Sequence, residues 1–450
     1  MGELFGTDGI RGKVNVYPIV PELVLQLGKA IAAMFDTSDA RKSGILIGKD
    51  TRQSGAMLEK ALTSGLVSAG MNVFHLGLIP TPAVAHLTRS MKATMGIMLT
   101  ASHNPFHDNG IKMFDGLGFK LSDRIESKIE RLLLDKTSKD SHVQVDHLGK
   151  AQSVEDSSRL YIDYVKNTID NQNLNGLKIV LDCANGASYL VGNSIFSELG
   201  VEVVETAVDP DGLNINNNCG ALYPETLSGL VQQHGADVGI AFDGDADRVV
   251  FCDAEGKVLD GDRILAMCAL DYERRGYLSK NTLVVTVLSN LGLHEAMKSN
   301  NIRVVTTAVG DRYIVQKMRS AGYNLGGEKS GHIIFMNHST TGDGIIGALQ
   351  VLKIMKETGQ PLSELSECMH EYPHRMVSIN VRKKRPLGEL VRLSEATSEC
   401  KAELGDHGRV LIRYSGTEKK IRLLIESQEE KQVQKWIDTL VTLIRQEIGT

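Results

Sequence analysis

The sequence predicts an α/β protein with three similar α/β domains, each with a mixed sheet, and a smaller C-terminal α+β domain around a central cleft. Three observations favour this fold class. A strand–helix–strand segment occurs three times, each copy is accompanied by a further strand with a polar loop behind it, and the C-terminal region follows another pattern. At 450 residues the chain is also too long for one ordinary core. The expected domains are residues 1–150, 151–255, 256–369 and 370–450.

Each repeated segment begins with a short aliphatic strand, passes a polar loop, continues with helical periodicity and turns into a second strand. The turns are expected at Gly70, at Gly200 and at Asn300 with Asn301. The three segments are residues 45–77, 179–205 and 283–310.

A chemically distinctive loop follows a further strand in each unit. These loops read TASHNP after GIML, DGDADR after VGIAF, and GGEKSGH after YNL. Ligands of open α/β sheets bind at the carboxyl ends of strands, so the three loops are expected to converge on one cleft. From about residue 370 the pattern changes to a strand, a helix, two strands around the tight loop RYSGTE, and a final helix, which is typical of a small α+β domain.

Composition excludes several classes of protein. The net charge of −5 and the absence of a dense Lys/Arg cluster argue against a nucleic-acid partner. The six cysteines have no close pairs, so neither a disulfide framework nor a zinc site is expected, which fits a cytoplasmic protein. The amino terminus lacks the features of a signal peptide, and no apolar stretch approaches the length of about 20 residues that spans a membrane.

The loop DGDADR predicts a metal site. Asp243, Asp245 and Asp247 stand at alternate positions, and three carboxylates between apolar strands repel one another unless a cation lies among them. Oxygen ligands favour magnesium or manganese. An EF-hand is excluded because Arg248 and Ala254 occupy the positions that need Gly and Glu. The alternative for such a match taken alone is a solvated acidic turn.

Ser102 in TASHNP is the candidate nucleophile. A lone serine is more often a cap or turn residue, but a metal loop in the next repeat and a candidate proton carrier in Lys112 favour the reactive interpretation. Three carboxylates do not complete an octahedral magnesium site, and a phosphorylated Ser102 would supply the fourth protein ligand.

Two further loops favour binding of a sugar phosphate. In RYSGTE, the backbone around Ser415, Gly416 and Thr417, with Arg413 and Arg422, is typical of an anion cradle, although a plain hairpin turn is equally compatible. In GGEKSGH, an extended loop would turn Glu328, Ser330 and His332 to one side as a comb for sugar hydroxyls; the alternative is a glycine-rich surface loop. GDGIIG matches GxGxxG but leads into a long helix, so we expect a helix start there and no dinucleotide site.

Taken in order, FGTDGIRG, TASHNP, DGDADR, GGEKSGH and RYSGTE resemble the motifs of the α-D-phosphohexomutase family over essentially the whole chain. TASHNPFHDNGIKMF, PDGLNINNNCGALYPE and TTGDGIIGALQVL are more similar to the branch that acts on glucosamine phosphates than to the mannose and glucose phosphate branches. The resemblance implies that Ser102 is the phosphoserine and that the magnesium ligands are Asp243, Asp245 and Asp247. It implies that Glu328 and Ser330 bind the sugar, and that the substrate's phosphate is bound by Arg413, Ser415, Gly416 and Thr417. The residues that it places around the transferring phosphoryl group are Arg11, Lys112, Arg248 and His332.

The resemblance implies an isomerase that interconverts glucosamine 6-phosphate and glucosamine 1-phosphate for UDP-N-acetylglucosamine biosynthesis. It implies one Mg²⁺ per subunit, a phosphoserine enzyme, and a hexose or glucosamine 1,6-bisphosphate as activator. Lys112 is the first choice for the proton carrier, and His332 is the alternative if its imidazole is neutral near pH 7. The sequence leaves open whether the protein is a monomer or a homodimer.

Two residues depart from the family pattern: Lys329 stands where this branch commonly has Gln, and Lys419 where the family commonly has Pro. Alternation along an extended loop would turn Lys329 outward, which predicts preference for glucosamine phosphate. The alternatives are a phosphomannomutase/phosphoglucomutase, a phosphatase using the same serine, and a non-catalytic sugar-phosphate sensor. Closure of the C-terminal domain over the substrate would exclude water and argues against the phosphatase, and the retained nucleophile and metal ligands argue against the sensor.

Overall fold

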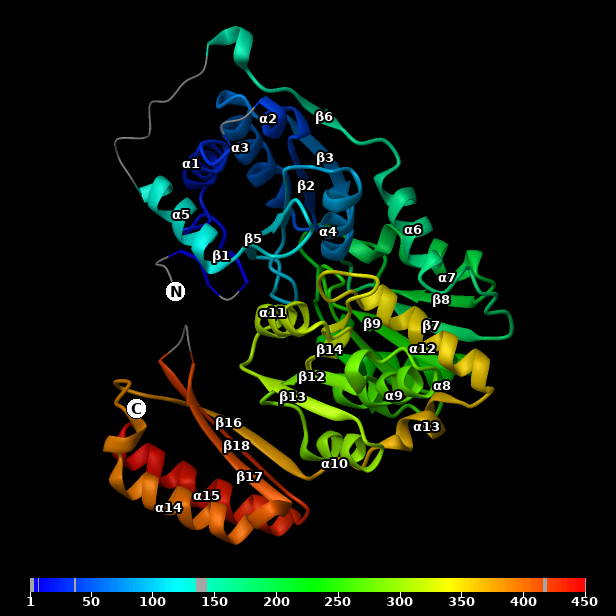
Figure 1. Ribbon diagram of the computed structural model, residues 1–450, viewed down its shortest axis with the longest axis vertical. Coiled ribbons are helices and arrows are strands. Elements are labelled where there is room, and N and C mark those ends of the chain that lie inside the picture. Colours follow the sequence, from blue (N-terminus) through cyan, green and yellow to red (C-terminus); the bar gives the residue numbers. More distant parts are fainter. Residues whose placement is uncertain (1–3, 7, 36–37, 135–143, 416–418, 450) are drawn as a thin grey trace. The chain divides into compact units, whose positions relative to one another are not determined.

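The aliphatic segments of the sequence form four sheets in the computed structural model, which describes residues 4–6, 8–35, 38–134, 144–415 and 419–449. The chain divides into two compact units. The first comprises residues 1–288 and 300–368 and holds three sheets, and the second comprises residues 289–299 and 369–450 and holds the fourth (Figure 1).

The first sheet has six strands in the order β1-β5-β4-β2-β3-β6. Strands β3, β2 and β4 pair in parallel, and β5 is antiparallel to β4. Both ILIGK of β2 and MGIML of β4 are almost wholly buried, as expected of strands covered on both faces. The strands are β1 (Ile10–Lys13), β2 (Ile45–Lys49), β3 (Val73–Leu78), β4 (Met95–Leu99), β5 (Asp108–Asp115) and β6 (Ala151–Ser153).

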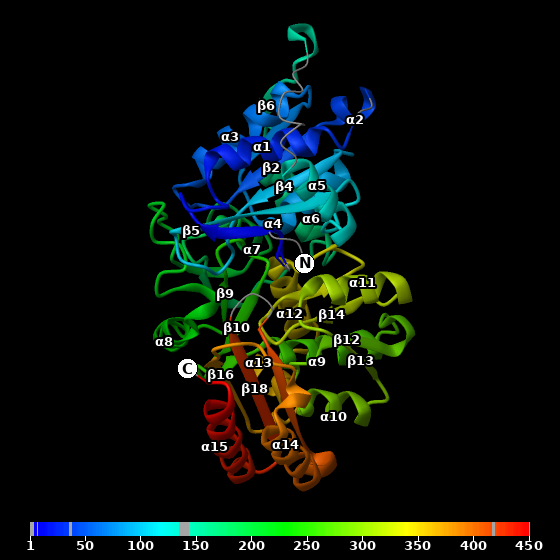
Figure 2. The same cartoon turned by 90° about the vertical axis from the view of Figure 1, so that its left-hand side faces the viewer.

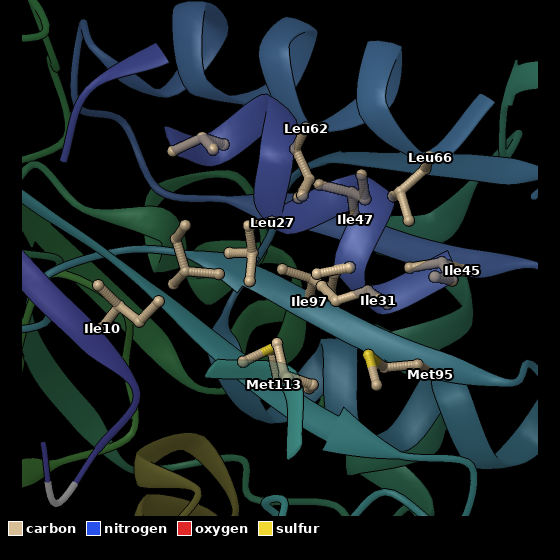
Figure 3. Packing of buried hydrophobic residues seen from close by; sticks show 14 of the residues in the cluster. Ile10, Leu27, Ile31, Ile45, Ile47, Leu62, Leu66, Met95, Ile97 and Met113 are labelled. Carbon is tan, nitrogen blue, oxygen red and sulfur yellow. The ribbon is translucent and has the colours of Figure 1, made fainter. Parts of the chain in front are cut away.

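Helices α1 (Pro21–Ala32) and α3 (Gly55–Ser68) pack on this sheet through one apolar cluster. Leu27 and Ile31 of α1, with Leu62 of α3, meet isoleucines of the central strands, as Figure 3 shows. Three further helices belong to this region: α2 (Ser38–Ser43), α4 (Thr81–Ser90) and α5 (Asp123–Leu134). The core holds the sheet rigid and so fixes the point where β4 ends.

The second and third sheets repeat this topology, with strand orders β11-β10-β9-β7-β8 and β13-β12-β14-β15. In each, three parallel strands are followed by an antiparallel one: β8-β7-β9 then β10, and β13-β12-β14 then β15. The predicted threefold repeat is therefore confirmed. The strands are β7 (Lys178–Asp182), β8 (Glu202–Thr206), β9 (Val238–Phe242), β10 (Val249–Asp253), β11 (Val258–Leu259), β12 (Thr282–Thr286), β13 (Arg303–Thr307), β14 (Leu325–Gly327) and β15 (Ile333–Phe335).

The predicted turns of the repeats adopt the left-handed conformation, with φ of 87° at Gly70 and Gly200 and 57° at Asn301. Glycine and asparagine enter this region at the lowest cost. GDGIIG begins α12 as expected: the Asp343 side chain accepts a hydrogen bond from the Ile346 N–H and caps the helix. The helices of these repeats are α6 (Ser157–Asn167), α7 (Gly192–Glu198), α8 (Pro224–His234), α9 (Gly261–Arg274), α10 (Leu291–Ser299), α11 (Asp311–Ala321), α12 (Gly344–Thr358) and α13 (Leu362–Leu365).

The second unit has the α+β architecture that the sequence predicts. An antiparallel sheet in the order β16-β18-β17 carries two helices on one face, as Figure 2 also shows. Trp436 and Leu440 of the last helix pack against Leu423 and Ile425 of the sheet in one cluster. The elements are β16 (His374–Asn380), α14 (Val391–Leu404), β17 (Gly408–Tyr414), β18 (Lys420–Ser427) and α15 (Glu430–Glu447).

Three other predictions meet the structure in different ways. The six cysteines are free thiols. No helix within the described ranges combines the length and apolar character needed to cross a bilayer. The four domain ranges stay a prediction; β6, at the start of the second expected range, pairs with β3 of the first sheet.

Candidate active site

The loop after β4 holds Ser102 in a strained conformation. Its φ is 53°, in the left-handed region that non-glycine residues rarely adopt, and such strain persists only where the surroundings enforce it. The Ser102 N–H donates to Thr100 Oγ1 at 2.8 Å, and the buried Ser102 Oγ donates to Asp243 Oδ2 at 2.6 Å. The structure thus brings the predicted nucleophile against the predicted metal loop.

His103 also lies at this hydroxyl, with Nδ1 3.3 Å from Ser102 Oγ. Burial, and then the charges of Arg248 and Arg11, lower the pKa of His103 to about 4, so its ring is neutral at pH 7. His103 is absent from the predicted site residues. Its only signal in the sequence is its position beside Ser102.

The three aspartates after β9 form one buried cluster. Ligand oxygens of Asp243, Asp245 and Asp247 all lie within 4.8 Å of one another, and each residue is at most 3% exposed. Asp245 Oδ1 is buried and accepts no hydrogen bond from the described residues. A compact set of carboxylate oxygens with an unsatisfied buried acceptor fits a hard divalent cation such as Mg²⁺ or Mn²⁺.

The protonation of the triad reflects the crowding of charge. Burial, followed by repulsion from Asp247 and Asp245, raises the pKa of Asp243 to about 7. Burial also opposes ionisation of Asp247, but Lys112 and then His332 hold the pKa of that carboxyl well below its usual range. The pKa values of Asp243 and Asp247 are therefore shifted in opposite directions, although the two residues share one loop.

Lys112 of β5 lies between two of the aspartates. Its ammonium donates to Asp245 Oδ2 and to Asp247 Oδ2, at 2.7 Å each, and the side chain is 1% exposed. Burial opposes the charge, but Asp245, Asp247 and Asp8 raise the pKa of Lys112 well above its usual value. Lys112 thus lies at the predicted site and acts there as an internal counter-charge; its role as a proton carrier stays a prediction.

A second layer of charges surrounds Lys112, and Arg11 is the one member of it that the sequence predicted. Asp8 pairs with Arg11 (3.0 Å), with Lys112 (3.4 Å) and with Lys120, and Lys120 also contacts Asp311 at 2.6 Å. Asp8 stands in FGTDGIRG, where the motif was the only signal, and Lys120 and Asp311 stand outside the quoted motifs. Arg11, on β1, is placed next to the site by its pairing with Gly110 of β5.

His332 has two kinds of neighbour that act in opposite directions. The Gly342 N–H donates to Nε2 at 3.0 Å, which requires an unprotonated nitrogen there. Burial opposes a charge on the ring, but Asp247 and Asp311 raise the pKa of His332 to about 10. The amide hydrogen bond therefore favours a neutral ring. The two carboxylates favour a charged ring: Asp311 Oδ2 lies 3.3 Å from Nε2, and Asp247 Oδ1 lies 3.6 Å from Nδ1. His332 lies at the site, and its role as the alternative proton carrier stays a prediction.

The loop Glu328–His332 is a tight turn, so the expectation of an extended loop is wrong. The Gly331 N–H donates to the Glu328 carbonyl, and the Glu328 N–H donates to the His332 carbonyl, at 3.0 Å each. A Cβ on Gly331, where φ is 88°, would stand 2.2 Å from the Val249 carbonyl oxygen, so the chain must turn here. His332 is consequently buried, Ser330 is exposed, and the three side chains do not form a simple alternating comb.

Two other residues of this loop are held by neighbouring helices. Glu328 accepts a hydrogen bond from the Gly310 N–H (3.1 Å), immediately before α11. Lys329 Nζ lies 3.1 Å from Oδ2 of Asp260, which caps α9. Turn geometry and this ion pair, and not strand alternation, therefore set the direction of Lys329.

Arg248 follows the triad directly. Its backbone N–H donates to Asp243 Oδ1 at 3.2 Å, and its Nε lies 3.9 Å from Asp247 Oδ1. Burial opposes the charge, but Asp247 and Asp243 raise the pKa of Arg248.

The second unit contains the remaining predicted residues. Arg413 of β17 and Arg422 of β18 stand directly opposite each other in the antiparallel ladder. Burial and then Arg422 lower the pKa of Arg413, and Arg413 Nη2 is buried without a hydrogen-bond partner among the described residues. Ser415 is buried beside this pair in sequence, whereas Gly416 and Thr417 lie outside the described residues. Facing like charges are destabilising, so the pair fits an anion.

The fold repeats one α/β topology, and a strained loop serine donates a hydrogen bond to a buried acidic triad. These features indicate the class of phosphohexomutases, and comparison with known proteins supports that class. Models of phosphoglucomutase/phosphomannomutase match throughout: α/β/α domain I at residues 2–140, domain II at 159–256, domain III at 260–372 and the C-terminal domain at 376–443. The chain belongs to the phosphoglucomutase/phosphomannomutase family.

Relatives that match over their full length indicate the branch of this family to which the chain is most similar. The chain is 49% identical to a phosphoglucosamine mutase of Pelobacter propionicus and 48% identical to one of Geotalea daltonii, covering 100% of this chain and 99% of each relative. A Burkholderia thailandensis phosphoglucomutase/phosphomannomutase family protein has the same fold, with a TM-score of 0.81 at 22% identity and 99% coverage of both chains. An Aspergillus fumigatus N-acetylphosphoglucosamine mutase, solved with GlcNAc-6P and magnesium, has a TM-score of 0.70 at 18% identity, covering 99% of this chain and 96% of that one.

Proposed function

We propose that this protein is an isomerase that interconverts glucosamine 6-phosphate and glucosamine 1-phosphate through a phosphoserine at Ser102 and a bisphosphorylated sugar. The observation that carries the proposal is the 2.6 Å contact between Ser102 Oγ and Asp243 Oδ2 within the buried triad. Names of full-length relatives support the substrate, on the route to UDP-N-acetylglucosamine. A glucosamine or hexose 1,6-bisphosphate is the proposed activator, since it can phosphorylate a resting Ser102.

The chemistry is a pair of phosphoryl transfers. The free hydroxyl oxygen of the sugar phosphate attacks the phosphorus on Ser102, the bond from phosphorus to Oγ breaks, and the hydroxyl proton passes to a base. The bisphosphate then reverses its orientation in the site. Ser102 Oγ attacks the phosphorus of the other phosphoryl group, and the sugar oxygen that loses this group takes a proton. Such transfers depend on positioning and charge neutralisation more than on covalent help.

The residues fit a magnesium ion. Asp243, Asp245 and Asp247 would hold it, with the Ser102 phosphate as a further ligand, and it would supply charge stabilisation to the transferring group. Arg248 and Arg11 are proposed to neutralise the phosphoryl oxygens, and Lys112 or His332 to move the proton. Glu328 and Ser330 are proposed to bind sugar hydroxyls, and Arg413, Ser415, Gly416, Thr417 and Arg422 the phosphate that does not react.

The test is turnover of glucosamine 6-phosphate with Mg²⁺ and glucose 1,6-bisphosphate, compared with glucose and mannose phosphates under the same conditions. We expect the highest kcat/KM for glucosamine phosphate. Equal or better turnover of a mannose or glucose phosphate would assign the protein to the phosphomannomutase/phosphoglucomutase branch. Release of inorganic phosphate in place of the isomer would identify a phosphatase.

A further inference from the structure

Arg52, three residues after β2, is buried, and both terminal nitrogens of its guanidinium donate hydrogen bonds to backbone carbonyls around Ser102. The residue is 2% exposed. Nη2 donates to the carbonyl oxygens of Ser102 (2.9 Å) and Asn104 (2.7 Å), and Nη1 donates to those of Pro105 (2.5 Å) and Asp108 (3.0 Å). Four backbone carbonyls, three from the loop after β4 and one from the first residue of β5, thus converge on a single side chain.

Asp50 fixes the guanidinium from the other side. Arg52 Nε donates to Asp50 Oδ2 at 2.9 Å, and the same oxygen accepts from Thr100 Oγ1 at 2.7 Å. Thr100 Oγ1 in turn accepts the Ser102 N–H. These hydrogen bonds form a closed ring. Asp50 and Arg52, which follow β2, are linked by it to the N–H of Ser102 through Thr100 and to the carbonyl of Ser102 directly.

The ring accounts for the strained backbone of Ser102. A carbonyl that points at Arg52 sets the following N–H, that of His103, in the opposite direction, because the trans peptide is planar. Asn216 Nδ2 donates to the same Ser102 carbonyl (2.8 Å) and to that of Asn104 (3.1 Å). A Cβ on Gly244 would stand 2.7 Å from the Ser102 oxygen, so the metal loop also closes against it. The peptide has little freedom to relax.

We propose that Arg52 is a positioning residue for phosphoryl transfer: its fork, anchored by Asp50, holds the strained Ser102 loop so that Oγ stays aimed at the acidic triad. This inference rests on the proposed function. No lysine can replace the fork, because an ammonium has three donors and lacks the fixed planar geometry that reaches four carbonyls and a carboxylate. A merely structural arginine would support the fold and leave the phosphoryl-transfer step of the folded protein unchanged.

The test compares Arg52→Lys with the matched variant Thr51→Val, whose neighbouring hydroxyl donates to the Asn185 carbonyl (2.6 Å) and not to the Ser102 loop. Intact-mass analysis after rapid mixing with glucose 1,6-bisphosphate and Mg²⁺ measures the rate of Ser102 phosphorylation, alongside kcat, KM and the melting temperature. For Arg52→Lys we expect transfer and kcat to fall by about 10²-fold, as for a displaced reacting group, with KM little changed. Thr51→Val should transfer at the wild-type rate.

Wild-type transfer in folded Arg52→Lys, or a loss in Thr51→Val equal to that in Arg52→Lys, would overturn the proposal. If Arg52→Lys does not fold, Asn216→Ala decides, because it removes two hydrogen bonds from the same carbonyls. A slower transfer at unchanged KM supports the proposal, and a wild-type rate overturns it. Failure of the wild-type protein itself to accept a phosphoryl group would contradict the proposed function, and this inference with it.

Discussion

The acidic triad and the arginine pair of the C-terminal unit place like charges together in different ways. The triad is buried and already contains a counter-charge, since Lys112 bridges Asp245 and Asp247. Arg413 and Arg422 face each other across a hairpin, and Arg413 Nη2 has no hydrogen-bond partner among the described residues. The triad thus has an internal counter-charge that offsets part of its repulsion, whereas the proposed anion site has no such counter-charge at Arg413 Nη2 among the described residues.

The largest expected effect is that of replacing Ser102, whose hydroxyl donates a hydrogen bond to Asp243 of the triad. Ser102→Ala should abolish mutase turnover and leave the fold intact, because the hydroxyl is the acceptor and the side chain adds little to packing. Intact-mass analysis should show a phosphate-sized increment on the wild type and none on the variant. Ser64→Ala, at an exposed helix position, is the control. Normal turnover by Ser102→Ala would exclude the covalent mechanism.

Removing one charge from the triad tests whether the carboxylates bind a metal. Asp245→Asn should weaken Mg²⁺ affinity and turnover strongly, because a hard cation loses an anionic ligand, and excess chelator should stop the wild type. Calorimetric titration with Mg²⁺ measures the affinity. Asp343→Asn also changes a buried carboxylate, but Asp343 caps α12 and accepts a hydrogen bond from Tyr161 Oη, so the variant should keep wild-type Mg²⁺ affinity. Full activity in chelator would contradict the metal site.

Arg413→Ala tests the other half of the comparison. Under the proposed function, both orientations of the bisphosphate use Arg413 to hold the phosphate that does not react. Forward and reverse kcat/KM should therefore both fall, by an amount that corresponds to about 2 kcal/mol or more in transition-state free energy. Initial rates in both directions give the comparison. Arg409→Ala, on the same strand but paired with Glu426, is the control. A defect in one direction only would show that the two binding modes use different anchors.

The burial of the Asp343 carboxylate should make the stability of the protein depend on pH. Burial raises the pKa of Asp343 from 3.8 to about 7, against the hydrogen bonds from Ile346 N and Tyr161. The folded state therefore binds the proton more tightly than the unfolded chain. Protonated Asp343 therefore stabilises the folded state. This contribution to the free energy of unfolding is complete below about pH 4 and is lost as pH rises through 7, by up to about 1.4 kcal/mol per pH unit.

Denaturant unfolding across this pH range measures the effect. Asp343→Asn keeps the cap acceptor and cannot ionise, so it should lack this component of the pH dependence and be the more stable protein above pH 7. An unchanged profile in the variant would contradict the assignment.

The smallest effect is expected at Lys329. Its ammonium is paired with Asp260, so Lys329→Gln should change kcat/KM for glucosamine phosphate by less than about 1 kcal/mol. The ratio of kcat/KM for glucosamine and glucose phosphates is the measurement. A large gain for glucosamine phosphate would show that the ammonium repels the substrate.

The sequence predicted what depends on local pattern and repeats. Strand periodicity and the turns at Gly70 and Gly200 indicated the three similar sheets, and the buried flanks of DGDADR indicated the triad. What it did not predict depends on contacts between residues distant in the sequence. Lys120 forms ion pairs with both Asp8 and Asp311, and Arg52 donates hydrogen bonds to backbone carbonyls around Ser102. No sequence motif indicates either set of contacts. The turn at Glu328–His332 was also missed, because the requirement for glycine at Gly331 comes from the Val249 backbone, which is distant in the sequence.

The repeated topology has a consequence for how such a protein can diversify. In each of the three sheets, the loop in question joins the third parallel strand to its antiparallel neighbour: β4 to β5, β9 to β10, and β14 to β15. The proposed nucleophile, metal ligands and sugar contacts thus lie on separate loops at equivalent positions of one architecture. Under the proposed function, a change in the third loop would alter the choice of sugar and leave the phosphoryl chemistry of the first two loops in place, so specificity and reactivity would be free to evolve at different speeds in one chain.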